Sequence, residues 1–240
     1  MLALFVSLLL AHILGDFILQ PQKWVEHKEK HTYKSIFLYL HIGVHLACTS
    51  LVLLTTPIYL WLIIPIGITH YLIDLAKLRF RNKKNKVLLF FLDQALHILI
   101  LALLTLQYNA PKLDWTLLDM EPILLLATFI LLSTVVSAVL MRTVLQNWDK
   151  DITKENKKKS LKGAGNYIGV LERLFVFTFV VLGHWSAIGF LIAAKSAFRF
   201  GDLSEAKNRK LTEYMLIGTL LSFGLALLFG ILYLQISKLY

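Results

Sequence analysis

Long apolar stretches alternate with short polar ones from the beginning of the chain to its end. Eight of the apolar stretches are candidates for bilayer-crossing helices, which need about 20 predominantly apolar residues each. They cover 2–20, 36–54, 58–76, 87–107, 122–141, 166–183, 185–199 and 211–236. The seventh is the shortest, and it is expected to be tilted or to span only in part. The pattern predicts an all-α fold, a polytopic transmembrane helical bundle with seven or eight spans.

Composition supports a membrane protein, and seven or eight spans leave no space in the chain for a separate soluble domain. Of the 240 residues, 57% are hydrophobic and 17% are charged, whereas soluble proteins average about 45–50% and 25%. One membrane domain is therefore expected over 1–240, with a four-helix half at 1–107, an outer loop at 108–121 and a C-terminal helical half at 122–240. The stretch 2–20 lacks the basic start and the cleavage site of a signal peptide, so it is expected to remain as the first span.

Basic residues gather in polar segments that alternate with segments nearly free of them. Four segments hold 22 of the 25 Lys and Arg residues: 21–35, 77–86, 142–162 and 195–210. The intervening segments 55–57 and 109–121 contain Lys112 as their only basic residue. This alternation is the positive-inside pattern, which places the basic segments in the cytoplasm, in contact with anionic lipids, and both chain ends outside. It explains the net charge of +10 without a nucleic-acid partner, and none is expected.

Each of the first four spans carries two His or Asp residues four positions apart. The pairs are His12 and Asp16, His41 and His45, His70 and Asp74, and Asp93 and His97. This spacing puts both members of a pair on one face of a helix. An ionised Asp inside a bilayer costs about 2.5–3.5 kcal/mol, so these side chains should face the bundle interior and have partners there. His27 and His31 share the spacing, but they lie among Lys and Glu in 21–35 and are expected to be solvated.

Imidazole nitrogen and carboxylate oxygen together form a ligand set that suits divalent metals. All eight residues are candidate ligands, and Asp16, Asp74 and Asp93 are also candidates for a catalytic base. Zinc is the first choice, with manganese or iron as alternatives. Some of the carboxylates can instead orient imidazoles. Two other interpretations remain open, namely a metal-free proton or ion relay, and hydrogen bonds between helices that serve packing alone.

A smaller polar group lies in the later spans. Glu172 and Arg173 fall in the sixth span, and Lys195 and Arg199 lie one helical turn apart in the seventh. Glu172 is a natural partner for a basic neighbour, and the cationic side chains can hold a phosphate or another anion. The four residues are candidates for substrate or anion binding. The alternative for Lys195 and Arg199 is that they extend to the membrane surface as topological charges.

Several short motifs resemble those of one protein family. The motifs are HILGDFILQ, HYLID, DQALH, GNYIGVLERL, AIGFLIAAKSAFRF and EYMLIGTLLS. Together they resemble the domain-of-unknown-function 3307 family of bacterial and phage membrane proteins, most specifically over 1–107 and 160–225. This resemblance implies a bacterial inner membrane and a polytopic fold, but no particular activity. The N-terminal half is more loosely similar to membrane-bound metal-dependent hydrolases.

The function expected from these observations is that of an intramembrane metal-dependent hydrolase. A metal with one open coordination position activates water near neutral pH, and a site in the cytoplasmic half of the membrane favours a lipid or lipid-linked substrate. The alternatives are a proton- or metal-coupled transporter and a non-catalytic membrane partner protein. Signatures of zinc peptidases, P-loop NTPases and serine hydrolases (HExxH, GxxxxGK and GxSxG) are absent from the sequence.

Overall fold

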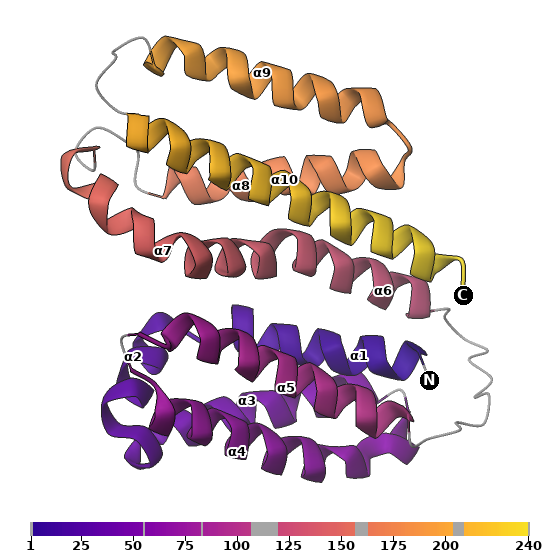
Figure 1. The fold of residues 1–240 in the computed structure, drawn as a ribbon. Coiled ribbons are helices and arrows are strands. Elements are labelled where there is room, and N and C mark those ends of the chain that lie inside the picture. Colours follow the sequence, from indigo (N-terminus) through magenta and orange to yellow (C-terminus); the bar gives the residue numbers. More distant parts are fainter. Residues whose placement is uncertain are drawn as a thin grey trace. The chain divides into compact units, whose positions relative to one another are not determined.

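The computed structural model describes residues 2–54, 56–82, 84–106, 120–156, 163–203 and 209–239. Within these ranges the chain forms helices and no β-strand, so the predicted all-α fold is confirmed. Contacts between Cα atoms divide the chain into two compact units, Met1–Thr128 and Phe129–Tyr240. Figure 1 shows the helices of each unit.

The first unit is a four-helix bundle with one additional short helix. Its elements are α1 (Leu2–Ile13), the π-helical turn η1 (Leu14–Ile18), α2 (Gln22–His31), the 3₁₀ turn η2 (Thr32–Lys34), α3 (Ile36–Leu53), the 3₁₀ turn η3 (Pro57–Leu62), α4 (Ile63–Phe80) and α5 (Lys86–Leu106). Helix α1 packs against α3 and α5, and α4 packs against the same two helices. The four helices therefore form a closed ring of neighbours, as the paired His and Asp residues predict.

The first membrane segment is sharply bent where the chain passes from η1 to α2. The helical segments Leu2–Ile18 and Gln22–Lys34 meet at 83°. Pro21 stands at the start of α2 with an extended backbone, and it cannot donate the hydrogen bond that would continue the preceding helix. Helix α2 then packs against α3. The basic segment 21–35 thus contains a helix that folds back on the bundle.

Apolar and polar residues occupy different halves of this bundle. The apolar half is a cluster of buried residues, namely Leu4, Leu8, Leu53, Tyr59, Leu62, Ile66 and Leu101. On α1 and α4, the residues His12 and His70 come about one turn after these apolar residues. Helices α3 and α5 run in the opposite direction, and on them His45 and His97 come before the apolar residues. Antiparallel neighbours therefore bring the paired residues of all four helices to the same level.

The second unit contains a long interrupted helix and three further helices. They are α6 (Met120–Leu131), the π-helical turn η4 (Leu132–Val136), α7 (Ser137–Asn156), α8 (Ala164–Val181), α9 (Trp185–Leu203) and α10 (Arg209–Ser237). Helix α10 packs along α7 and α8, and α9 packs against α8. Helix α7 extends to Asn156, so the fifth apolar stretch continues as helix well into the polar segment 142–162.

Six described helical segments are long and apolar enough to cross a membrane. They are Ile36–Leu53, Pro57–Phe80, Lys86–Leu106, Glu121–Gln146, Ala164–Val181 and Thr212–Ser237. The bent segment that begins at Leu2 is a seventh if it counts as one span. The seventh predicted span, 185–199, corresponds to Trp185–Ala197, the apolar part of α9, which at 1.5 Å per residue falls short of the ~30 Å hydrocarbon core. The chain is a multi-pass membrane protein.

Candidate metal centre

All eight predicted metal ligands lie in the first unit, and their side chains are almost completely buried in the interior of the bundle. His12, His41, His45, His70, Asp74, Asp93 and His97 are buried, and the Asp16 side chain retains 10% of its exposure. The expectation that these side chains face the bundle interior therefore agrees with their burial. Burial without compensation would be costly for ionisable groups, so the partners of each group matter.

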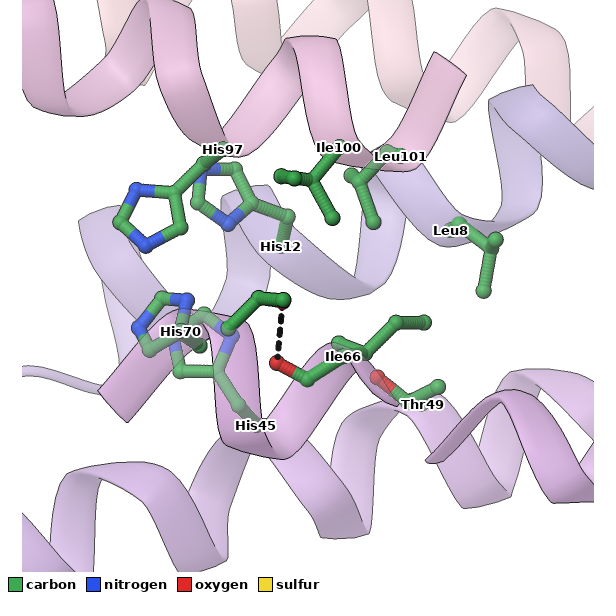
Figure 2. Close-up of a pocket in the computed structure, with 10 residues that line it drawn as sticks. Leu8, His12, His45, Thr49, Ile66, His70, His97, Ile100 and Leu101 are labelled. Carbon is green, nitrogen blue, oxygen red and sulfur yellow. Dashed lines mark hydrogen bonds between the residues drawn. The ribbon is translucent and has the colours of Figure 1, made fainter. Parts of the chain in front are cut away.

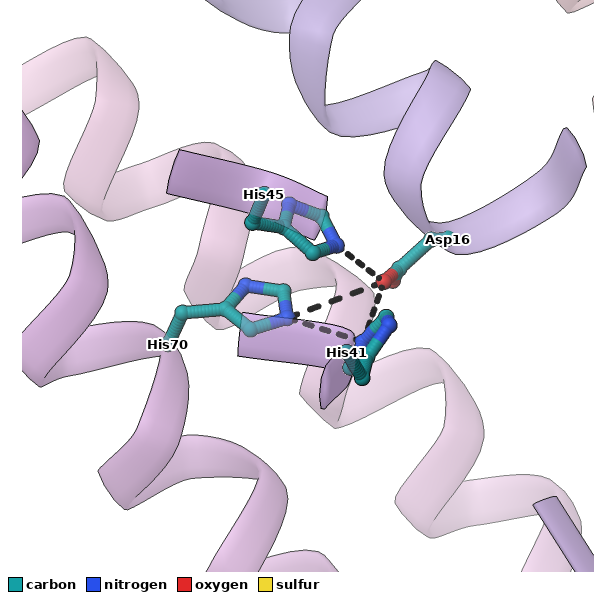
Figure 3. A group of neighbouring side chains, drawn as sticks. All are labelled: Asp16, His41, His45 and His70. Atoms are coloured by element: carbon teal, nitrogen blue, oxygen red, sulfur yellow. Dashed lines mark hydrogen bonds and ion pairs between the residues drawn. The ribbon is translucent and has the colours of Figure 1, made fainter. Parts of the chain in front are cut away.

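Three imidazoles from two helices converge on the Asp16 carboxylate (Figure 3). Asp16 Oδ1 lies 3.0 Å from His45 Nε2, 3.2 Å from His41 Nε2 and 3.7 Å from His70 Nε2. The Nε2 atoms of His41 and His70 are 3.1 Å apart. A tetrahedral zinc ion with bonds of about 2.0–2.1 Å holds its ligand atoms about 3.3–3.4 Å apart. The four measured distances, 3.0–3.7 Å, bracket this spacing, and all four atoms lie within 4.8 Å of one another.

Two further groups of potential ligands overlap the Asp16 group. One consists of His12, Asp16 and His97, and the other of His70, Asp74 and His97. In each group the ligand atoms lie within 4.8 Å of one another. Because Asp16, His70 and His97 each belong to two groups, the cluster offers several adjacent positions for a cation.

Four imidazoles line a small cavity on the apolar side of the cluster (Figure 2). His45 and His70 have ring centroids 3.8 Å apart, and those of His70 and His97 are 4.1 Å apart. The cavity has a volume of about 10 Å³, and residues such as Leu8 and Ile66 line its other end. This volume is close to the minimum that one water molecule needs.

Some buried polar atoms of the cluster have no hydrogen-bond partner in the part of the chain that the structure describes. They include both ring nitrogens of His97 and Oδ1 of Asp93. His97 Nδ1 and Asp93 Oδ1 face each other at 3.9 Å, which is too long for a hydrogen bond. Buried polar groups are almost always satisfied, so these atoms call for an additional ligand such as a cation or a water molecule.

Two of the three aspartates pair with lysines that the sequence does not mark as site residues. Lys28 Nζ donates to Asp74 Oδ2 at 2.8 Å, and Lys77 Nζ donates to Asp93 Oδ2 at 2.6 Å. Lys77 follows Asp74 by three positions, so helical spacing could have placed it near the cluster. Lys28 gives no such signal, because it lies in a polar segment and becomes buried only when α2 folds back.

Two glutamines also join the cluster. Gln94 donates from Nε2 to Asp16 Oδ2 at 2.7 Å, and its Oε1 lies 3.3 Å from His12 Nε2. The amide nitrogen of Gln20 lies 2.9 Å from each ring nitrogen of His41. Both glutamines stand in motifs that carry site residues, HILGDFILQ and DQALH. The available signal was a polar amide within or directly after an apolar helix, close to a His or Asp of the cluster.

Gly15 makes the close approach of α3 to η1 possible. A Cβ atom at this position would overlap the His45 imidazole. Gly15 is buried inside the π-helical turn, where Leu19 N donates to Leu14 O at 2.9 Å. The turn and the missing side chain together leave His45 space to reach Asp16.

His27 and His31 stay outside the cluster. His31 is exposed and His27 is half-buried. Their rings stack with centroids 4.0 Å apart, and His27 Nδ1 lies 2.8 Å from Ser35 Oγ. Neither residue belongs to any group with metal-ligand spacing among the described residues.

The second predicted polar group lies in the second unit. Lys195 forms an ion pair with Glu172, so Glu172 has the basic partner that its position predicts. Arg173 is buried, with 3% of its surface exposed. These three residues line one cavity. Arg199 lies within α9, but its side chain falls outside the described residues, and its predicted role in anion binding stays a prediction.

The fold and the cluster define a class, namely multi-pass helical membrane proteins with a buried His/Asp site. The chain belongs to the DUF3307 family, described as "Protein of unknown function", whose model matches residues 4–126. The predicted resemblance to this family is thereby confirmed, whereas the looser similarity to metal-dependent hydrolases stays a prediction. The matched segment contains all eight His and Asp residues of the cluster, whereas the C-terminal motifs lie outside it. No curated protein and no solved structure matches the chain.

Proposed function

We propose that this protein binds a divalent metal ion in its first unit and uses it as an intramembrane hydrolase. The convergence of the Nε2 atoms of His41, His45 and His70 on one oxygen of Asp16 carries the proposal. A carboxylate oxygen has two lone pairs, which hydrogen bonds from His45 and His41 would already occupy, so His70 Nε2 at 3.7 Å is left without a hydrogen bond to this oxygen. A cation between these atoms resolves this, because each nitrogen then donates its own lone pair to the metal.

The ligand set favours zinc, with manganese or iron as alternatives, since all of its atoms are imidazole nitrogens or carboxylate oxygens. A bound ion would supply Lewis acidity, and it would activate water for hydrolysis at a fifth coordination position, because the four protein ligands already fill a tetrahedral shell. In this proposal Asp16, His41, His45 and His70 hold the ion, and His12 and His97 border the adjacent position. Asp74 belongs to the overlapping ligand group of His70 and His97, and its Oδ2 lies 3.7 Å from His41 Nε2. Asp93 is the candidate base, because its Oδ1 has no hydrogen-bond partner among the described residues.

The proposed substrate is a lipid or a lipid-linked molecule. In this proposal the protein lies in a bacterial inner membrane with its basic loops in the cytoplasm, and the substrate reaches the cluster from the cytoplasmic leaflet. Lys28 and α2 cover the cluster at Asp74. The cavity beside the histidines has space for water but not for a larger reactant. Entry of a substrate therefore requires α2 to move away from the bundle.

Metal analysis of the purified full chain tests the proposal directly. We expect roughly one zinc, manganese or iron ion per chain, and loss of most of it in His41→Ala and in His70→Ala. His31→Ala is the matched control, because this imidazole is exposed and lies outside the cluster. A metal-free wild-type protein, prepared without chelator and unable to bind added metal, would contradict the proposal. So would equal metal content in all variants.

A second candidate function is transport of a cation or proton. The observation that favours it is the overlap of three ligand groups through Asp16, His70 and His97, because adjacent weak sites allow an ion to pass from one to the next. Proteoliposomes loaded with a metal-sensitive or pH-sensitive dye distinguish the candidates. Uptake that His70→Ala abolishes supports transport, whereas metal-dependent release of acyl or phosphoryl products without uptake supports hydrolysis.

A further inference from the structure

The second unit contains a large cavity that the metal centre does not explain. It has a volume of about 800 Å³ and lies among α7, α8, α9 and α10, within the range of 300–1,000 Å³ typical of small-molecule sites. Apolar side chains such as Leu145, Ile168 and Leu191 form part of its wall. Its polar part combines neutral side chains such as Asn166 with four charged residues, namely Arg142, Glu172, Arg173 and Lys195.

Arg173 is the most unusual residue of this wall. It stands in the middle of α8, a helix apolar enough to span the membrane, with 3% of its surface exposed. Its hydrogen bonds go to neutral groups: Nη2 donates to Thr134 O at 3.1 Å, and Nη1 donates to Ser222 Oγ at 3.4 Å. Its Nε is buried and has no hydrogen-bond partner among the described residues.

The nearest carboxylate in the wall does not neutralise this guanidinium fully, because it already has a cationic partner. Glu172 forms an ion pair with Lys195. Among the described residues, the lining thus contains three cationic side chains and one carboxylate. A buried charge without a counterion is strongly unfavourable, so an excess of positive charge beside an apolar cavity indicates an anionic ligand.

The backbone around Arg173 is shaped to hold its guanidinium. The π-helical turn η4 presents the carbonyl of Thr134 to Nη2, and π-helical turns occur frequently at functional sites. Gly169, one turn before Arg173, leaves room for the side chain, since a Cβ there would lie 3.1 Å from Nη1. Both features fix the guanidinium at the cavity wall.

We propose that this cavity binds the phosphate group of an anionic phospholipid, with Arg173 as the main phosphate contact. A guanidinium presents a planar fork of donors that matches a phosphate group, and Nε is one of those donors. Lys195 and Arg142 add positive charge around the headgroup, while the apolar wall accommodates the acyl chains. The site is independent of the His/Asp cluster and requires no metal.

The test uses the purified full chain in a mild uncharged detergent. Thermal unfolding and native mass spectrometry are followed as phosphatidylglycerol, phosphatidylcholine with the same acyl chains, or inorganic phosphate is added. We expect phosphatidylglycerol to bind and to raise the melting temperature more than phosphatidylcholine does. An equal effect of inorganic phosphate would show that the site binds free phosphate and not specifically a lipid headgroup. No binding of any probe, or equal binding of both lipids, would overturn the proposal.

Variants locate the binding within the molecule. Replacing a charged hydrogen-bonding partner costs about 1.5–3 kcal/mol, so Arg173→Gln should weaken phosphatidylglycerol binding about tenfold or more. Lys238→Gln removes a positive charge from the exposed end of the chain, and it should leave binding unchanged. If both variants bind equally well, Arg173 is not the phosphate contact.

A cavity-filling variant keeps the proposal testable if Arg173→Gln does not fold. Gly165 lines the cavity, and a Cβ at this position would meet no other atom within 4 Å. Gly165→Leu should therefore block the acyl chains without removing any charge. Gly224→Leu is the matched control, because Gly224 has equally open surroundings and does not line the cavity. Unchanged lipid binding in Gly165→Leu would overturn the proposal.

Discussion

Single residues control the geometry of the His/Asp cluster in ways that their spacing along the chain does not reveal. The i,i+4 pairs are visible in the sequence because helical geometry places both members on one face. Their environment is not visible, since it comes from residues such as Gly15, Gln94 and Lys77, which approach from other turns or other helices. Predicting which residues meet is thus easier than predicting what holds them in place.

Replacing Gly15 with alanine tests this control. A Cβ at this position would overlap the His45 imidazole, so Gly15→Ala should move His45 away from Asp16. We expect a loss of stability of about 1–3 kcal/mol, as for other overpacked interiors. The higher helix propensity of alanine compared with glycine offsets only part of this loss. Metal affinity, measured by competition with a chelator, should fall about tenfold if metal binding needs His45 in place.

Gly43→Ala is the control for this substitution. Gly43 lies in α3, two residues before His45, and a Cβ there would meet no atom within 4 Å. We expect this variant to keep the stability and the metal affinity of the wild type, or to gain slightly in stability. If Gly15→Ala behaves in the same way, the close packing of η1 against His45 is unimportant for the site.

At the level of elements, both polar sites lie where a helix departs from the regular α form. Asp16 belongs to the π-helical turn η1, and Thr134, which accepts a hydrogen bond from Arg173, belongs to the π-helical turn η4. Such turns alter the direction of the side chains and carbonyls around them. The sequence predicts a helix at both places, but the pattern of apolar residues does not reveal the extra residue in the turn.

A buried ion pair helps to hold helix α2 against the bundle, beside the more exposed ion pair of Glu29 with Arg81. Lys28 reaches into the bundle and donates to Asp74 Oδ2 at 2.8 Å, with 4% of its own surface exposed. Removing one partner of a buried pair costs about 3–5 kcal/mol, because the other charge stays buried and unpaired. Lys28→Met should therefore lower the melting temperature and increase hydrogen exchange in α2.

Lys30→Met provides the comparison, since Lys30 is an exposed residue of the same helix. It should leave the melting temperature and the exchange of α2 near their wild-type values. The double variant Lys28→Met with Asp74→Asn should recover much of the lost stability, because no uncompensated charge remains. If the single and the double variants are equally unstable, the pair does not hold α2 in place.

For the whole molecule, the distribution of charge predicts how the chain sits in its membrane. Lys84 lies in the basic connection between α4 and α5, and Ile58 lies in η3, at the other end of α4. Both side chains are exposed. The positive-inside pattern places Lys84 in the cytoplasm and Ile58 on the opposite side.

Labelling of introduced cysteines measures this orientation. The chain contains one natural cysteine, Cys48, which Cys48→Ala removes. In that background, a membrane-impermeant maleimide added to intact cells should label Ile58→Cys, and it should label Lys84→Cys only after the membrane is opened. The reverse result would invert the orientation and move the His/Asp cluster to the outer half of the bilayer.

The sequence by itself determines the helical class, the membrane segments and the four pairs of His and Asp residues. These features follow from local composition and from helical periodicity, which act over one or two turns of chain. Only the tertiary structure decides that Lys28 forms an ion pair with Asp74, that the His45 imidazole packs directly against Gly15, and that Arg173 lines a cavity. The physical reason is that these contacts join residues from different helices, and their energy depends on burial that no local pattern encodes.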